Sequence, residues 1–170
     1  MKLPIYQLDA FTDRVFGGNP AAVVVMREWL DDSILQAIAA ENNLSETAFV
    51  IPGADHSRLR WFTPRLEMDL CGHATLATAH VLFDEHFPAQ TDLRFETKSG
   101  SLAVSRREEL LFLDFPSRPG QSVAITERII EALGTEPVAV FLARDLMVVL
   151  ETEAQVRGFA PDYPAIEALE

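Results

Sequence analysis

Hydrophobic and polar positions along the chain alternate in several short stretches that predict β-strands. Alternation or strand-forming composition marks residues 3–8, 21–26, 58–63, 92–97, 101–105 and 109–115, and an apolar stretch after residue 45 ends at Pro52. Apolar residues at helical spacing behind Asp31, Asp32 and Ser33 predict a helix over about 32–42 that stops at Asn42 and Asn43.

One segment differs from all the others. From Ala74 to Phe83 the chain carries no formal charge, barring a protonated His80, and apolar or small residues occur on every side of a helical wheel. A helix that is apolar all round is buried all round in a soluble protein, and this one is too short to span a bilayer. We therefore predict an α+β fold in which a strongly curved, largely antiparallel sheet wraps around a helix at 73–85.

A second pattern begins after Pro116, Pro119 and Gly120. It predicts helices at 124–133 and 152–158 and strands at 137–142 and 146–150. These strands are too few to enclose a helix. Their order of apolar strand, acidic turn and helix repeats the order in the first part of the chain. We therefore predict a first domain at 1–116 and, at 117–170, a linker and the beginning of a second, similar domain that is incomplete here.

The net charge of the chain limits the classes of molecule that we expect it to bind. The chain has 14 basic and 26 acidic residues, a net charge of −12, and an acidic surface repels both phosphate backbones and anionic lipid. Arg58, Arg60 and Arg65 form a cluster too thin for a binding stripe. We expect neither nucleic acid nor membrane as a partner. The one cysteine, Cys71, cannot form an intramolecular disulfide, which agrees with a reducing compartment and a cytoplasmic protein.

Glu46 is the first candidate for chemistry, because it stands where a predicted helix gives way to an apolar strand. It can simply cap a turn and remain solvated. It can also lie at the edge of the hydrophobic core, where partial burial would raise its pKa toward the range of a general acid/base. The residues around it fit both interpretations.

A second candidate stretch runs from Cys71 to Ala74, where the buried helix begins. Small residues there let a ligand approach unpaired backbone N–H groups, and the helix dipole favours a carboxylate at that point. Alternatively, Gly72 permits a tight turn and Cys71 is a small buried hydrophobe. His73 could be a proton shuttle, a hydrogen-bond donor or a satisfied residue of the first turn.

The remaining features indicate little by themselves. Gly17, Gly18, Asn19 and Pro20 predict a tight turn, which is a frequent structure. The other three histidines have no second ligand at metal spacing, so we expect no metal site at His56, His80 or His86.

Taken together, these stretches resemble a known family in order and spacing. The matching pieces are LDAFT and FGGNPAAVV within 8–25, NLSETAF (43–49), RWFTPRLEMDLCGHATLATAH (60–80), and SGSLAVS with LFLDFP within 99–116. They resemble the PhzF-like proteins of phenazine biosynthesis, which are relatives of diaminopimelate epimerase. The resemblance implies an α+β, diaminopimelate epimerase-like fold of two similar halves, each a curved sheet around a central helix, with the active site in the cleft between them. We also expect a homodimer.

The resemblance assigns roles to the candidates. It implies that Glu46 moves a proton from one carbon to another on a small carboxylate-bearing metabolite, without metal or organic cofactor. The residues implied to line the substrate pocket are Asn19, Cys71, Gly72, His73 and Ala74. In epimerase relatives a cysteine before this glycine is one of two acid/base thiols. This chain has no second cysteine, so we interpret Cys71 as pocket lining or core.

PhzF-like chains continue beyond the length seen here, and their second half supplies an Asp-Pro-x-x-Gly-Ser stretch that faces the glutamate. Nothing after Pro116 matches that stretch. We therefore expect an isomerase that is incomplete in this chain. The alternative is a non-catalytic fragment, or a half-domain that binds a small ligand and folds by dimerising.

Overall fold

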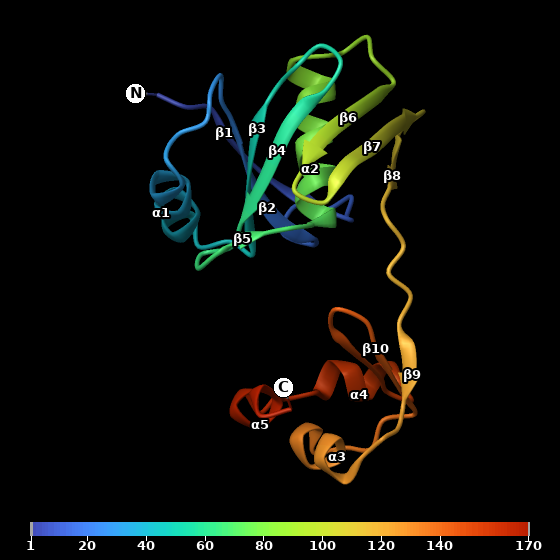
Figure 1. Cartoon of the computed structure of the whole chain (residues 1–170). Helices are drawn as coiled ribbons and strands as arrows, with labels where there is room; N and C mark the ends of the chain where they lie inside the picture. The colour runs from blue at the N-terminus through green and yellow to red at the C-terminus, as the bar shows by residue number, and fades with distance from the viewer. Residues whose placement is uncertain (1, 170) are drawn as a thin grey trace. The chain divides into compact units, whose positions relative to one another are not determined.

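The computed structural model describes residues 2–169. They form two compact units, and the boundary between these units lies after Phe115 (Figure 1). Each unit has its own sheet and is described by itself below.

The first unit is built on one curved sheet with the strand order β1-β2-β3-β4-β6-β7-β8, and a short strand, β5, pairs with β4. The β2/β3 and β4/β6 pairs are parallel, whereas the other pairs are antiparallel, so the sheet is largely antiparallel, as predicted. The strands are β1 (Ile5–Ala10), β2 (Asn19–Val25), β3 (Glu46–Ile51), β4 (Ser57–Phe62), β5 (Glu67–Met68), β6 (Asp92–Thr97), β7 (Gly100–Arg107) and β8 (Leu110–Asp114).

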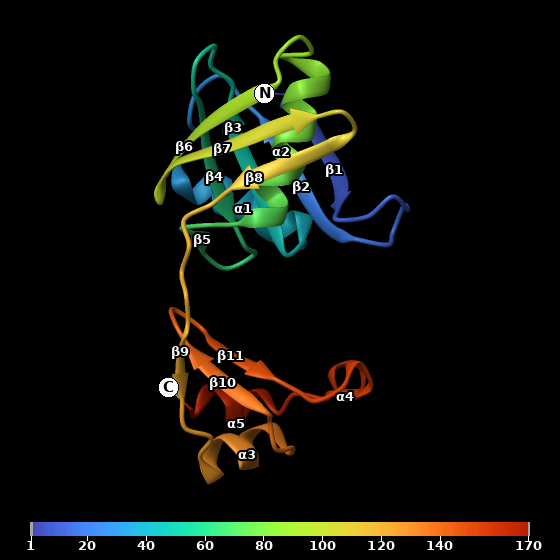
Figure 2. The same ribbon diagram turned by 90° about the vertical axis from the view of Figure 1, so that its right-hand side faces the viewer.

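Helix α2 (Gly72–Glu85) lies inside the curve of this sheet, and Figures 1 and 2 show strands passing around it on several sides. Nine of its 14 residues are buried, which confirms the predicted enclosure of the helix. The hydroxyls of two buried threonines, Thr75 and Thr78, donate to the carbonyls of Cys71 and Ala74 at 2.6 and 2.7 Å. Burial of these two hydroxyl groups therefore costs little free energy, because both are hydrogen-bonded.

The prediction that this helix is buried all round is wrong on one side. The side chain of His80 is 55% exposed, and Leu76 is only partly buried. The reason is that β1 and β8 are the two ends of the strand order and do not pair with each other. Residues of both strands, with Leu76 and His80, line a hollow of about 870 Å³ over this side of α2.

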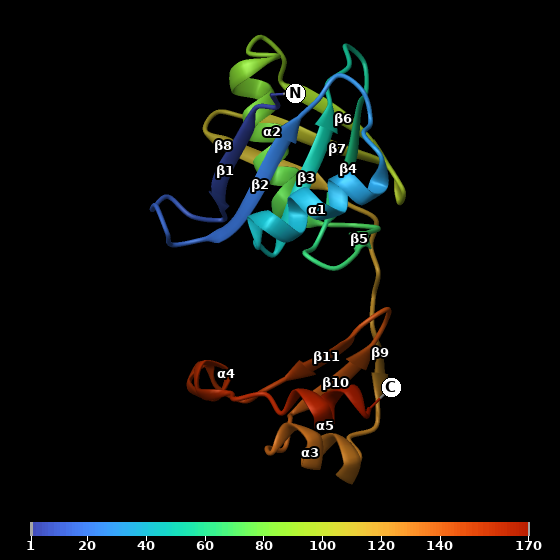
Figure 3. The same ribbon diagram turned by 90° about the vertical axis from the view of Figure 1, so that its left-hand side faces the viewer.

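Helix α1 (Asp32–Asn42) covers the opposite, outer face of the sheet, as Figure 3 shows. Its Leu35 and Ala39 pack with Val24 and Phe49, whereas the alternate residues of β2 and β3 face the α2 side. These two strands are therefore buried on both faces, which explains their unbroken apolar runs. The helix ends as predicted, because Asn43 adopts the left-handed conformation (φ 50°) that terminates helices.

The second unit has a three-stranded antiparallel sheet of order β11-β10-β9 and three short helices. The elements are β9 (Gln121–Val123), α3 (Glu127–Leu133), β10 (Ala139–Leu142), β11 (Leu146–Val149), α4 (Glu153–Gly158) and α5 (Tyr163–Glu167). Helix α3 begins later than predicted because the Thr126 hydroxyl caps it by accepting from the Ile129 N–H. Strand β9 was not predicted, since three residues are too few for a pattern. Within the described part of this unit only Ala132, Pro137 and Val140 are buried.

No helix within residues 2–169 combines the length and the apolar character that a membrane crossing needs.

Candidate active site

The beginnings of β2, β3 and α2 carry the candidate residues of the first unit. Glu46 is the first residue of β3 and lies opposite Ala21 of β2 in the parallel register. Asn19 is the first residue of β2, so the predicted turn ends earlier than expected and Asn19 belongs to the strand. The Ser45 hydroxyl donates to Asn19 Oδ1 at 3.1 Å and links the start of β2 to the residue before Glu46.

Glu46 and His73 meet at this end of the unit. Oε2 of Glu46 lies 3.3 Å from Nε2 of His73, and the two side chains are 17% and 9% exposed. The Nε2 atom is buried and has no directed hydrogen-bond partner among residues 2–169, so the carboxylate lies beside this nitrogen rather than in line with it. The sequence singled out both residues, but nothing in it predicted their contact.

Cys71 contacts the other nitrogen of the same ring. Its Sγ atom and Nδ1 of His73 are 3.5 Å apart in a hydrogen bond. Burial raises the pKa of the Cys71 thiol to about 12; the backbone N–H of Ala74 opposes this rise, the charge of Glu46 adds to it, and the His73 N–H opposes it. A thiol with this pKa is protonated near neutral pH. It is therefore poorly suited to act as a thiolate base.

Gly72 and Ala74 contribute backbone rather than side chains. A Cβ atom on Gly72 would lie 3.2 Å from Cε2 of Phe115, so the missing side chain lets Phe115 pack against the start of α2. The Ala74 side chain is fully buried. N–H groups in the first turn of a helix have no carbonyl partner within the helix and attract negative charge.

These residues also include three possible metal-ligand types. One atom each of Glu46, Cys71 and His73 lies within 4.8 Å of the others. Carboxylate, thiolate and imidazole are all zinc ligands. Here, however, the thiol lies nearest to Nδ1 of the ring and the carboxylate lies nearest to Nε2, so the two groups approach different nitrogens of His73.

An ion-pair network holds the segment that leads into Cys71. Arg60 of β4 donates from Nε and Nη2 to both carboxylate oxygens of Glu67 in β5, at 2.7 and 2.9 Å, and from Nη1 to Asp32 at 2.9 Å. Lys98 also pairs with Glu67, and the Ser99 hydroxyl donates to the carbonyl of Asp69 at 2.7 Å. The hydrogen bond from Arg60 is the main cause that lowers the pKa of Glu67. The sequence did not predict this network, because Arg60 and Glu67 meet only through the pairing of β4 with β5.

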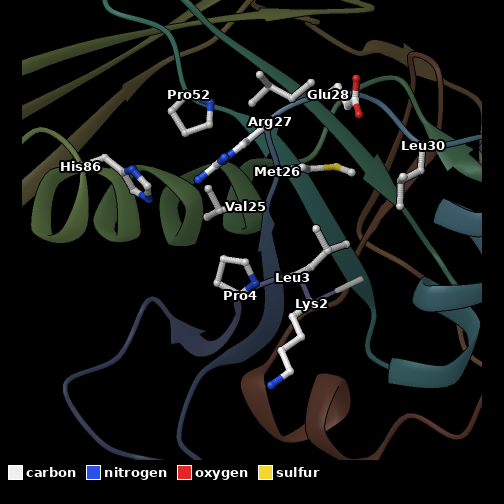
Figure 4. Close-up of a pocket in the computed structure, with 11 residues that line it drawn as sticks. Lys2, Leu3, Pro4, Val25, Met26, Arg27, Glu28, Leu30, Pro52 and His86 are labelled. Carbon is white, nitrogen blue, oxygen red and sulfur yellow. The ribbon is translucent and has the colours of Figure 1, made fainter.

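A separate hollow of about 750 Å³ lies at the other end of these elements, where β2, β3 and α2 finish (Figure 4). Val25, Ile51 and His86 are among the residues that line it. Its charged residues Lys2, Arg27 and Glu28 are all exposed. The Glu46 end of the unit therefore differs from this hollow, because it has partly or fully buried polar groups in mutual contact.

Comparison with known proteins identifies the family of this chain. The family model described as phenazine biosynthesis-like protein matches residues 8–169. The chain belongs to the phenazine biosynthesis-like (PhzC-PhzF) family. This confirms the resemblance that the sequence motifs indicated.

A bacterial isomerase sequence and a PhzF family structure are among the proteins that this chain is similar to. An uncharacterized isomerase of Pseudomonas aeruginosa is 49% identical over 169 residues, which is 99% of this chain and 65% of that protein. The crystal structure of a PhzF family protein of Enterococcus faecalis superposes with a TM-score of 0.90 at 48% identity, over 100% of this chain and 65% of that one. The chain spans about 65% of the length of the curated relatives it matches first.

A more distant likeness extends to the epimerase fold. A hydroxyproline epimerase of Agrobacterium vitis matches with a TM-score of 0.55 at 10% identity, over 87% of this chain and 51% of that one. The fold is α+β and epimerase-like, as predicted. The structure brings Glu46, Cys71 and His73 into contact, places Gly72 and Ala74 in the same first turn, and connects Asn19 to this end through Ser45.

Proposed function

We propose that this chain supplies the acid/base side of an isomerase that moves a proton between carbon atoms of a small carboxylate-bearing metabolite, without metal or organic cofactor. The contact of Glu46 with His73, at 3.3 Å and largely shielded from water, is the observation that carries the proposal. The description of the P. aeruginosa relative as an uncharacterized isomerase supports the reaction class.

In this proposal Glu46 acts first as base and then as acid. Its carboxylate removes a proton from one carbon, and the electron pair of that C–H bond moves into an adjacent unsaturated group of the substrate. The protonated Glu46 then returns its proton to another carbon, so the enzyme ends as it began. General acid/base groups of this kind contribute about 10²–10⁴-fold to the rate.

The first turn of α2 has the properties needed to receive the carboxylate of the substrate. The N–H groups of Gly72, His73 and Ala74 precede the first intrahelical hydrogen bonds, and the helix dipole adds partial positive charge there. Asn19 and Cys71 would complete the lining. A carboxylate at this place would lie beside both Glu46 and His73.

The test is exchange of carbon-bound hydrogen with solvent. The full chain in D₂O is incubated with a panel of small unsaturated carboxylic acids, and proton NMR follows the loss of C–H signals. Glu46→Gln should reduce exchange by about 10²–10⁴-fold. Glu41→Gln, at an exposed position on α1, is the matched control and should leave exchange unchanged. Exchange at near wild-type rate in Glu46→Gln would refute the assignment.

A second candidate function is a small-ligand-binding half-domain that folds by dimerising. The small buried core of the second unit favours it, together with the exposed apolar side chains of Val138, Met147 and Val156 there. We also infer that the protein is a homodimer, that it is cytoplasmic, and that residues 117–170 belong to a domain similar to the first unit. Sedimentation equilibrium tests the dimer. A monomer at micromolar concentration, combined with full hydrogen exchange protection of the second unit, would exclude this candidate.

A further inference from the structure

The two nitrogens of the His73 ring have different surroundings. Nδ1 faces the sulfur of Cys71 at 3.5 Å. Nε2 is buried, lacks a directed hydrogen-bond partner in the described part of the chain, and lies 3.3 Å from a carboxylate oxygen of Glu46. His73 as a whole is only 8% exposed, so water cannot freely satisfy either nitrogen.

Counting the protons decides between the two neutral forms of this ring. A neutral imidazole carries one N–H, and burial keeps the Cys71 thiol protonated. With the ring proton on Nδ1, the bare lone pair of Nε2 would face the negative carboxylate of Glu46, and Nδ1 could not accept from the thiol. With the ring proton on Nε2, Nδ1 accepts from the thiol, and the carboxylate lies beside a positively polarised N–H instead of a lone pair.

We propose that Cys71 is a positioning residue whose thiol donates to Nδ1 of His73 and thereby holds the ring proton on Nε2. The free N–H then lies beside Glu46 and is available to an oxygen atom of a ligand. This last step rests on the proposed function, whereas the tautomer itself does not. In such a reaction the N–H would stabilise the negative charge that develops on a substrate oxygen when Glu46 removes a proton.

This role differs from that of an acid/base thiol. Cys71 neither gives up nor receives a proton during turnover, so a single cysteine is sufficient. What matters is a donor beside Nδ1, and a serine hydroxyl at position 71 supplies one over a slightly longer gap. Cys71→Ser should therefore keep the Nε2–H form, whereas Cys71→Ala should lose its preference for it.

The experiment is long-range ¹H–¹⁵N correlation NMR of the ¹⁵N-histidine-labelled full chain near neutral pH. His73→Gln identifies the His73 signals. We expect wild-type His73 to be predominantly the Nε2–H tautomer, Cys71→Ser to retain it, and Cys71→Ala to show a mixture of tautomers. Backbone amide spectra of each variant confirm that the fold is retained.

The wild-type spectrum alone can overturn the proposal, even if Cys71→Ala does not fold. A predominant Nδ1–H tautomer, or a doubly protonated ring near neutral pH, would contradict it. An unchanged Nε2–H population in folded Cys71→Ala would also contradict it.

Turnover provides a second readout. If the chain catalyses exchange, Cys71→Ala should lower kcat by about 2–10-fold with little change in KM, and Cys71→Ser should restore most of it. If the wild-type protein catalyses no exchange, the proposed function is wrong. The proposed tautomer of His73 is then judged from the NMR spectra alone.

Discussion

Nε2 of His73 lies 3.3 Å from Oε2 of Glu46, so the first turn of α2 and the start of β3 meet through their side chains. The parallel pairing of β2 with β3 brings the start of β2 to the same end of the unit. A buried imidazole between a thiol and a carboxylate is a short polar chain inside an apolar unit. Its geometry depends on every element that holds the start of α2 in place.

The Arg60–Glu67 ion pair should be one of those elements. Arg60→Met removes two charge-assisted hydrogen bonds to a carboxylate that is only 13% exposed. We expect a loss of about 2–4 kcal/mol in the free energy of unfolding. Urea denaturation measures it, and Arg65→Met, at an exposed position, should change stability by less than about 0.5 kcal/mol. A loss in Arg60→Met as small as that expected for Arg65→Met would show that the network does not contribute to the free energy of unfolding.

The same ion pair predicts a dependence of stability on pH. The folded protein lowers the pKa of Glu67, chiefly through the hydrogen bond from Arg60, so its stabilisation is present above the unfolded value of about 4.3 and is lost as pH falls through the folded value. The difference in stability between wild type and Glu67→Gln should therefore shrink below about pH 4. A constant difference between pH 7 and pH 3 would contradict this.

Gly18 should be intolerant of any side chain. A Cβ atom there would lie 2.2 Å from the carbonyl oxygen of Ala10, which is backbone of the neighbouring strand and cannot give way cheaply. Gly18→Ala should cost about 1–3 kcal/mol and displace Asn19. Thermal unfolding measures the cost. Gly158→Ala is the control, since its added Cβ meets nothing within 4 Å apart from its chain neighbours and the backbone of its own helix, and it should be nearly neutral.

Cys71 should react slowly with thiol reagents in the folded protein. Burial raises the pKa of its thiol to about 12, so the thiolate fraction near neutral pH is very small. Its alkylation rate should rise about tenfold per pH unit from pH 7 to pH 10. In Cys71→Ser carrying Ser33→Cys, the exposed cysteine should react faster and level off near pH 8.5–9, close to an ordinary cysteine pKa. A plateau for Cys71 near pH 9 would rule out the raised value.

The two units should differ in local stability. Helix α2 is packed among large buried side chains, whereas α3 has a single buried residue, Ala132. Hydrogen exchange should therefore be slow for residues 74–83 and faster for 127–133. Equal, strong protection of both segments in a monomeric sample would show that the second unit is stable by itself.

The sequence predicted the parts of the fold that local pattern controls. The uncharged stretch from Ala74 to Phe83 predicted an enclosed helix, and the turn residues delimited most strands. The exposed side chain of His80 was not predictable, because it depends on β1 and β8 not pairing, and strand pairing is a property of the whole sheet. The contact between Glu46 and His73 was not predictable from the sequence for the same reason. It requires both the β2/β3 register and the direction of α2.

The central claim is that Glu46 and His73 act as one unit in proton transfer. A double-mutant cycle on solvent exchange, with Glu46→Gln, His73→Gln and the double variant in the same D₂O assay, tests it most directly. Each single substitution should abolish most of the exchange, and the double variant should lose little more than Glu46→Gln alone. Losses that multiply in the double variant, or near wild-type exchange in either single variant, would contradict the account.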